Sequence, residues 1–329
     1  MKVKRFFKKL VSWAGVFFFA VAAYALYHQL SKYQFAEIKQ ALFSIPHKNL
    51  MYACIASFCG YVALSSYDFL AIRYIGKKLA PWKWIFAGFI GFSVSNNAGH
   101  AIVSGGAIRY RLYTRWRFHA TEIVRMVTFS GFTYLVACFF LIVVGYILTP
   151  DHAFGEGGVS KVATTITTIC SAIGLTLYLG ASIFYKKPIM IKGIDFTMPN
   201  IKMALEQVFV GAADILMASL VLYFSLTGFV DIPFDTFIGV FIIAQVLGVF
   251  SQVPGGLGIF EGLFLYILPA GQTSTVQVFG ALIAYRVIYY LLPLLVSSIM
   301  LFTYEAALGI HYRNILKKHW KYKRKAEQQ

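Results

Sequence analysis

The chain has 329 residues, of which 59% are hydrophobic, 17% aromatic and 13% charged, and its mean hydropathy is +0.68. Soluble domains carry about 25% charged residues, so this composition excludes a water-soluble fold, which could not cover so much apolar surface. The formal net charge is +17, but the basic residues lie between hydrophobic blocks. That pattern indicates membrane topology and argues against a nucleic-acid partner.

The first hydrophobic block follows the basic stretch MKVKRFFKK and runs from about residue 10 to residue 30. A signal peptide is one interpretation, because Ala23, Tyr24 and Ala25 resemble a cleavage site. The apolar run exceeds the usual signal-peptide core of about 7–15 residues. We therefore favour an uncleaved membrane helix.

Several apolar stretches reach the length of about 20 residues that a membrane-spanning helix needs. They predict full spans at residues 10–30, 50–72, 123–148, 162–185, 203–227 and 278–306. Two further stretches, 84–108 and 234–268, are interrupted by Gly, Pro, Asn and Gln, which break helices or expose backbone groups that lipid cannot satisfy. The sequence thus predicts an all-α polytopic membrane protein with eight hydrophobic segments.

Basic residues are concentrated in alternate connections between these segments. Of the 30 Lys and Arg residues, 25 lie in residues 1–9, 73–83, 109–125, 186–202 and 311–325. Short basic connections mark the cytoplasmic side, so these five segments, and with them both termini, are predicted to be cytoplasmic. The connections 31–49, 149–161 and 228–235 are poor in basic residues and are predicted to face outward.

This alternation determines how the two interrupted stretches must run. Residues 84–108 have basic connections on both sides, so they must enter and leave by the same face, and they are too few for two crossings. A re-entrant helical hairpin turning near residues 95–99 is predicted, and a second one, turning at 251–258, from the opposite face. The alternative is two ordinary helices with kinks. Two opposed broken hairpins are typical of an inverted repeat around a transport site.

Ionisable residues at membrane depth are functional candidates, because each costs at least about 2.5 kcal/mol to insert. At least one of Asp214 and Arg286 is predicted to line a polar cavity, and the arginine fork suits a lipid phosphate. Glu261 follows the second predicted turn. Asp68 and Glu206 are also candidates, although a buried ion pair or a position at the interface would account for either.

Motifs of soluble enzymes are missing from the sequence. There is no Walker loop, HExxH, GxSxG or dinucleotide fingerprint, and the four cysteines lack metal-ligand spacing. We therefore expect a transporter and not an enzyme, with no catalytic residue, metal or cofactor. The basic and aromatic stretch 109–117 fits either simple topogenic charge or contact with anionic head groups of the inner leaflet.

Two stretches, SNNAGHAIVSGGAIRYRLY at 95–113 and QVPGGLGIFEGLF at 252–264, resemble the signatures of the lysylphosphatidylglycerol synthase transmembrane-region family. That family includes the flippase half of the bacterial multiple peptide resistance factor, an antimicrobial peptide resistance protein. The resemblance implies a phospholipid flippase of the bacterial inner membrane. The implied substrate-binding residues, with the polar candidates above, are Asn96, Asn97, Gly105, Gly106, Arg109, Arg111, Gln252, Pro254, Gly255, Gly256, Glu261, Asp68, Glu206, Asp214 and Arg286.

Residues 1–310 are predicted to form a single transmembrane lipid-translocase-like domain, and residues 311–329 a basic cytoplasmic tail. The tail is too short for the amino-acid-transferring synthase domain of the resistance factor. The expected partner is a membrane phospholipid, either phosphatidylglycerol or an aminoacylated form, and a homo-oligomer is left open. Two alternatives remain: an ion-coupled transporter of a small polar solute, and a membrane partner of a separate lipid-modifying enzyme.

Overall fold

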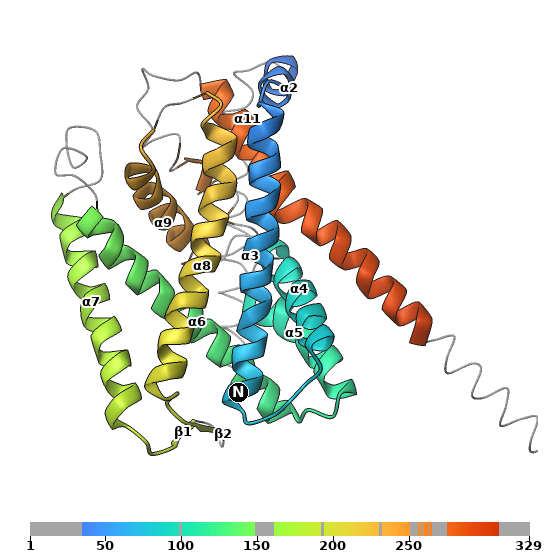
Figure 1. The fold of residues 1–329 in the computed structure, drawn as a ribbon, viewed down its shortest axis with the longest axis vertical. Helices are drawn as coiled ribbons and strands as arrows, with labels where there is room; N and C mark the ends of the chain where they lie inside the picture. The colour runs from blue at the N-terminus through green and yellow to red at the C-terminus, as the bar shows by residue number, and fades with distance from the viewer. Residues whose placement is uncertain are drawn as a thin grey trace, which may run out of the picture.

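The computed structural model describes residues 35–98, 101–148, 161–191, 194–229, 232–250 and 275–308, together with residues 256, 258, 260–262 and 264. The predicted first span, the basic tail and most of the second predicted turn lie outside the described residues. The described part is a bundle of helices with one short pair of strands (Figure 1).

The elements follow one another in this order: α2 Phe35–Phe43, α3 His47–Tyr74, α4 Pro81–Ala98, α5 Ala101–Arg115, α6 Ala120–Leu148, α7 Lys161–Phe184, β1 Ile189–Ile191, β2 Ile194–Phe196, α8 Ile201–Leu226, α9 Phe234–Phe250, α11 Thr275–Tyr285 and η3 Arg286–Leu291. The strands β1 and β2 pair antiparallel, with Ile189 opposite Phe196. The segment η3 is one wide helical turn, and the helix that begins with α11 continues through it to residue 308.

Five described helices are long and apolar enough to cross a bilayer: 47–74, 120–147, 164–184, 201–226 and 276–308. Each contains nearly all of one predicted span, so the prediction of an all-α polytopic membrane protein is confirmed for this part of the chain. Local sequence explains the boundaries of some helices. Pro81 occupies the first position of α4, where its missing N–H costs nothing. Asn200 caps α8 by accepting a hydrogen bond from the Met203 N–H at 2.9 Å.

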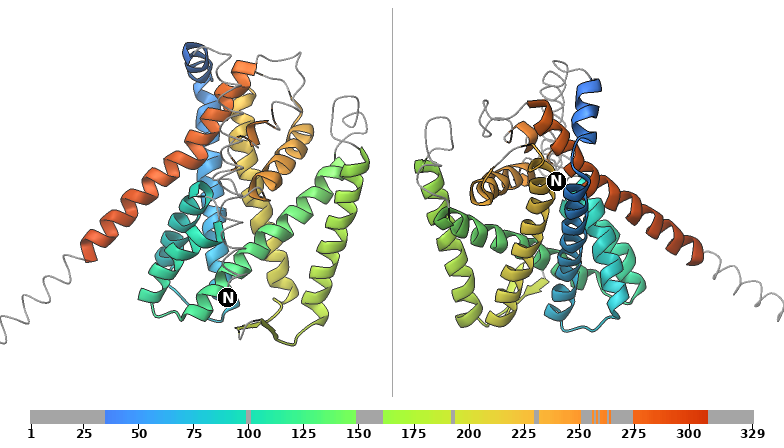
Figure 2. Two further views of the ribbon diagram at one scale, coloured as in Figure 1. Left: turned by 180° about the vertical axis from the view of Figure 1, so that it is seen from behind. Right: turned by 45° about the horizontal axis from the view of Figure 1, so that its top comes forward.

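The first interrupted stretch forms a helical hairpin. The helices α4 and α5 lie side by side on the flank of α3 and are separated only by residues 99 and 100, next to the predicted turn (Figures 1 and 2). The two outer ends of the hairpin meet at one end of the molecule, where the rings of Trp82 and Trp116 contact each other with centroids 6.0 Å apart. The chain therefore enters and leaves this hairpin at the same end.

Small residues allow the close approach of α4, α5 and α3. A methyl group added at Gly105 would overlap the Ser95 side chain and lie 2.9 Å from the Gly91 carbonyl oxygen. At Gly88 an added methyl group would lie 2.8 Å from the Cα atom of Ser65 on α3. These contacts leave no room for any larger side chain at Gly88 or Gly105.

The described residues that follow α9 in the second interrupted stretch, 256, 258, 260–262 and 264, include several that lie against α9, and together with α9 they are called the second hairpin below. After α9 the chain passes Gly256, whose φ of 63° favours glycine, and an added methyl group there would lie 3.2 Å from the Cα atom of Gly248. The ring of Phe260 then packs on Phe241 of α9 with centroids 5.6 Å apart. In Figures 1 and 2, α9 lies toward the end of the molecule opposite the outer ends of α4 and α5.

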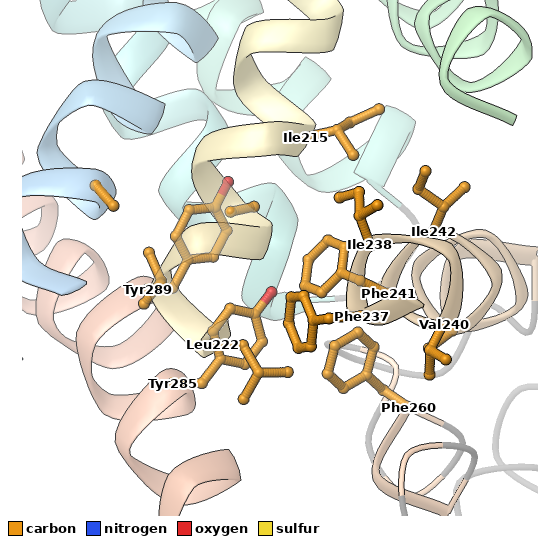
Figure 3. Packing of buried hydrophobic residues seen from close by; sticks show 14 of the residues in the cluster. Ile215, Leu222, Phe237, Ile238, Val240, Phe241, Ile242, Phe260, Tyr285 and Tyr289 are labelled. Atoms are coloured by element: carbon orange, nitrogen blue, oxygen red, sulfur yellow. The ribbon is translucent and has the colours of Figure 1, made fainter. Parts of the chain in front are cut away.

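The core lies where α3, α6, α8 and the second hairpin meet. The helix α8 runs along α3 over most of its length and also packs on α6 and α11. Side chains from α8, α9 and α11 fill the centre, with Phe241 and Phe260 facing Tyr285 (Figure 3). Gly211 lets α8 approach α6, because an added methyl group would lie 2.9 Å from the Thr133 carbonyl oxygen. The two hairpins are thus packed around the α3 and α8 pair.

Two neighbouring glycines test the packing of the first hairpin. We expect Gly105→Ala to lower the free energy of unfolding by about 1–3 kcal/mol, since the added methyl group meets backbone of α4. Gly106→Ala is the matched control, because nothing lies within 4 Å of its added methyl group. The measurement is thermal unfolding of the purified protein in detergent. Equal unfolding temperatures for the two variants would contradict this packing.

Candidate functional site

Asp68 of α3 and Arg109 of α5 form a buried ion pair. The Arg109 Nε atom donates to Asp68 Oδ1 at 2.8 Å and to Oδ2 at 3.2 Å, and the Tyr113 hydroxyl donates to Oδ2 at 2.7 Å. Asp68 is 1% exposed and Arg109 is 4% exposed. A carboxylate with an arginine and a tyrosine donor has the partners that an ionised group requires in a dry interior.

The Arg109 guanidinium lies in a space that α4 provides. Its Cζ atom is 4.2 Å from the ring centroid of Phe92, and an added methyl group at Gly91 would lie 3.1 Å from it. The Nη2 atom is buried and makes no hydrogen bond to any described residue. One edge of this guanidinium fork is therefore left for another acceptor.

Glu261 of the second hairpin pairs with Arg286, the first residue of η3. The Glu261 Oε1 atom accepts from Arg286 Nε at 2.7 Å and lies 2.6 Å from Nη2, while the other oxygen accepts from the Gly258 N–H at 2.7 Å. The guanidinium also covers the ring of Tyr290, 4.7 Å from the ring centroid. Each hairpin thus contributes one member of a largely buried arginine–carboxylate pair, and the arginine of each pair lies over an aromatic ring.

The wide turn η3 supplies backbone acceptors to both α3 and the first hairpin. Pro293 has no N–H, so it cannot donate the helical hydrogen bond to a carbonyl group one turn before it. The Ser57 hydroxyl donates to the Ile288 carbonyl at 3.1 Å, and the Tyr61 hydroxyl donates to the Tyr289 carbonyl at 3.0 Å. These bonds attach η3 to the middle of α3.

The end of α4 reaches the same turn. The Asn97 side-chain amide donates to the Tyr290 carbonyl at 3.2 Å and to the Ser93 carbonyl of its own helix at 2.8 Å. Asn97 is the second-to-last residue of α4, so the tip of the first hairpin touches η3 directly. Through Arg286 and Glu261 the second hairpin touches it as well.

Asp214 lies at the centre of α8 between two tyrosines. It accepts a hydrogen bond from the Tyr67 hydroxyl at 3.1 Å and one from the Tyr289 hydroxyl at 3.2 Å. It is 5% exposed. No described Lys, Arg or His forms an ion pair with it, in contrast to Asp68 and Glu261.

Other ion pairs lie toward the end of the molecule that holds the outer ends of the first hairpin, and they are partly exposed; one of them, at 4.0 Å, joins Arg125 of α6 to Asp195 of β2. Arg73 contacts Glu206 at 2.7 Å, Lys77 contacts Glu122 at 2.5 Å, and Arg115 contacts Glu305 at 2.7 Å. Arg111 also contacts Glu305, at 3.1 Å, and is 55% exposed. The hydrogen bonds that Arg115 donates to Glu305 raise the pKa of its guanidinium.

The structure separates the predicted site residues into groups. Asn97, Asp214, Glu261 and Arg286 meet around η3, with Asn96 beside them near the Tyr61 hydroxyl. Asp68 and Arg109 form their own pair nearby, with Gly105 under the guanidinium and Gly106 in open space. Glu206 and Arg111 instead form surface pairs. Gly256 is described, but Gln252, Pro254 and Gly255 lie outside the described residues.

Sequence reasoning missed the tyrosines that bind these groups. Tyr61, Tyr67, Tyr113 and Tyr289 each donate to a site carboxylate or to a carbonyl of η3. For Tyr289 the signal in the sequence was the stretch RVIYYL, which places tyrosines at membrane depth shortly before a proline. Among the described residues, no cluster of three His, Cys, Asp or Glu could hold a metal ion.

These features define a polytopic α-helical membrane protein with two hairpins and two buried ion pairs around one wide turn. The chain belongs to the family described as the lysylphosphatidylglycerol synthase TM region, whose model matches residues 12–297. The resemblance noted in the sequence is thereby confirmed.

Individual relatives differ in length. The chain is 34% identical to the uncharacterized protein slr0712 of Synechocystis sp. over 295 residues, 88% of this chain and 90% of that protein. It is 28% identical to the inner membrane protein YbhN of Escherichia coli over 300 residues, 90% of this chain and 91% of that protein. It is 31% identical to the phosphatidylglycerol lysyltransferase of Staphylococcus haemolyticus over 87% of this chain but only 33% of that protein.

Substitution of two carboxylates compares the contribution of the buried ion pair to stability with that of an exposed pair. We expect Asp68→Asn to lower the free energy of unfolding by about 3–5 kcal/mol, because it leaves the Arg109 charge buried without its partner. Glu206→Gln breaks the exposed pair with Arg73 and should cost less than about 1 kcal/mol. The measurement is unfolding of the two purified variants in detergent. A larger loss for Glu206→Gln would refute the assignment of the buried pair.

Proposed function

We propose that the chain is a phospholipid flippase of the bacterial inner membrane, moving an anionic or aminoacylated phosphatidylglycerol between leaflets. The observation that carries the proposal is a pair of arginines, the buried Arg109 and the largely buried Arg286, each beside the inner part of a hairpin and each held by one carboxylate. A guanidinium fork matches the geometry of a phosphate, so a lipid head group can replace the carboxylate as its acceptor.

The arrangement of the hairpins supports a path between the leaflets. In this proposal both hairpins are re-entrant, and their inner ends meet at η3 near the middle of the membrane, which is where transporters with inverted repeats bind their substrates. The helix α5 begins at Ala101 beside the break, and the positive end of its dipole favours a phosphate there. Separation of either hairpin from its partner helix would expose one arginine to one leaflet.

The orientation follows from the charges. We place the end that carries Arg73, Lys77 and Arg115 in the cytoplasm, since basic connections stay inside. Both termini would then be cytoplasmic, and residues 1–310 would form one translocating domain without enzymatic activity of its own. The aromatic and basic residues Trp82, Lys83 and Trp116 would lie at the inner head groups.

Arginine-to-lysine variants test the role of the two buried arginines. We expect Arg286→Lys and Arg109→Lys to slow translocation by at least about tenfold, because lysine keeps the charge but loses the planar fork. The assay follows a fluorescent phosphatidylglycerol in proteoliposomes as the outer leaflet is bleached.

Arg115→Lys is the matched control, since it makes the same change in an exposed pair with Glu305. Its translocation rate should stay within about twofold of the wild type. Unchanged rates in both buried variants would contradict the assigned roles. Uptake of a small solute without lipid movement would favour the transporter alternative. Activity that appears only with a separate lipid-modifying enzyme would favour the partner alternative.

A further inference from the structure

Asp214 differs from the other buried carboxylates of the site in its hydrogen bonds. Its two bonds from tyrosine hydroxyls measure 3.1 and 3.2 Å, whereas the bond from the Tyr113 hydroxyl to Asp68 measures 2.7 Å. Both oxygens of Asp214 accept from a neutral hydroxyl, whereas Asp68 also accepts from the Arg109 guanidinium.

The surroundings of Asp214 explain the difference. Asp68 and Glu261 each face an arginine, but no described cation contacts Asp214. A buried carboxylate without a cation is costly, and such groups take up a proton instead. Asp214 is thus the buried acid of this site whose charge is least compensated.

The titratable groups that bear on Asp214 among the described residues are neutral at ordinary pH. They comprise Tyr61 and Tyr67 of α3, Tyr134 and Cys138 of α6, and Tyr289 of η3, while the charged pair of Arg286 and Glu261 lies against Tyr290. Tyrosine and cysteine lose their protons only at much higher pH than a carboxylic acid does. Asp214 is therefore the group in this cluster that gains or loses a proton most readily.

Asp214 is also connected to both hairpins, in each case through two packed aromatic rings. On one side Tyr67 packs on Phe92 with ring centroids 5.3 Å apart, and the Arg109 guanidinium lies over the Phe92 ring. On the other side Tyr289 packs on Tyr290 with ring centroids 5.4 Å apart, and the Arg286 guanidinium lies over the Tyr290 ring. The protonation state of one carboxyl group thus determines the hydrogen bonding of tyrosines that adjoin both ion pairs.

We propose that Asp214 is the proton-binding site that couples lipid translocation to a proton gradient. This inference rests on the proposed flippase function. A proton from water on one side forms an O–H bond with the carboxylate, which becomes neutral, and the same proton leaves to water on the other side. Tyr67 and Tyr289 keep their own protons throughout. The protonated acid donates to one tyrosine oxygen, and that hydroxyl then turns to another acceptor.

The first experiment measures the proton on Asp214 directly. Infrared difference spectra of the purified full-length chain are recorded in detergent across a pH series. We expect a protonated-carboxyl C=O band that disappears as pH rises, that Asp214→Asn removes and that Asp68→Asn leaves in place. A band unchanged by Asp214→Asn, or no band at all, would overturn the proposal.

Tyrosine variants keep the test decisive if Asp214→Asn fails to fold. Tyr67→Phe and Tyr289→Phe each remove one hydroxyl donor to Asp214 and leave its charge unchanged. Each should displace the midpoint of the titration of the band, and unmoved midpoints in both would overturn the assignment. Tyr110→Phe is the control, since Tyr110 is exposed and lies on the outer part of α5.

The second experiment measures coupling in proteoliposomes with an imposed pH gradient. A gradient of one pH unit should change the leaflet distribution of the labelled phosphatidylglycerol up to about tenfold for each coupled proton. Asp214→Asn should abolish that response. Wild-type translocation that ignores the gradient would refute coupling but leave the flippase function intact. Absence of any translocation, with the infrared band still removed by Asp214→Asn, would refute the flippase function and its coupling, and would leave only the proton-binding site.

Discussion

The carbonyl groups of the wide turn η3, just before Pro293, are the constraint on which the centre of the molecule depends. A buried carbonyl without a donor costs about 1–3 kcal/mol, and hydrocarbon offers no water to replace the missing N–H. Ser57 and Tyr61 satisfy two of these groups from α3, and Asn97 binds the neighbouring Tyr290 carbonyl from the tip of the first hairpin. The exposed carbonyl groups of one wide turn therefore attach two separate elements to it.

The two buried ion pairs then secure the hairpins against the full-length helices. Burial of a charge pair seldom adds much net stability, because desolvation offsets most of the attraction. Removal of one partner is far more costly, so each pair holds its hairpin closed unless another acceptor replaces the carboxylate. A phosphate is such an acceptor, which is why the geometry suits a head group that enters between hairpin and helix.

Sequence reasoning predicted most of the helices because span length and apolar composition are properties of single segments. It also placed the first hairpin turn next to the observed break, since the charges on both sides required the chain to return to the same end. The pairing of Asp68 with Arg109 was out of reach, because it joins residues 41 positions apart on different helices. The tyrosines around Asp214 were missed for a related reason. The sequence does not show whether a tyrosine in an apolar stretch directs its hydroxyl at a carboxylate or only packs its ring against apolar neighbours.

The long helix that starts at Thr275 and continues to residue 308 joins the two hairpins mechanically. Near one end Arg286 binds Glu261 of the second hairpin, and near the other Glu305 binds Arg111 and Arg115 of the first. The wide turn and Pro293 lie between these two attachments, where the helix is least able to resist bending. The wide turn thus lets this helix bend between its two attachments, and displacement of either hairpin is transmitted through the helix to the other.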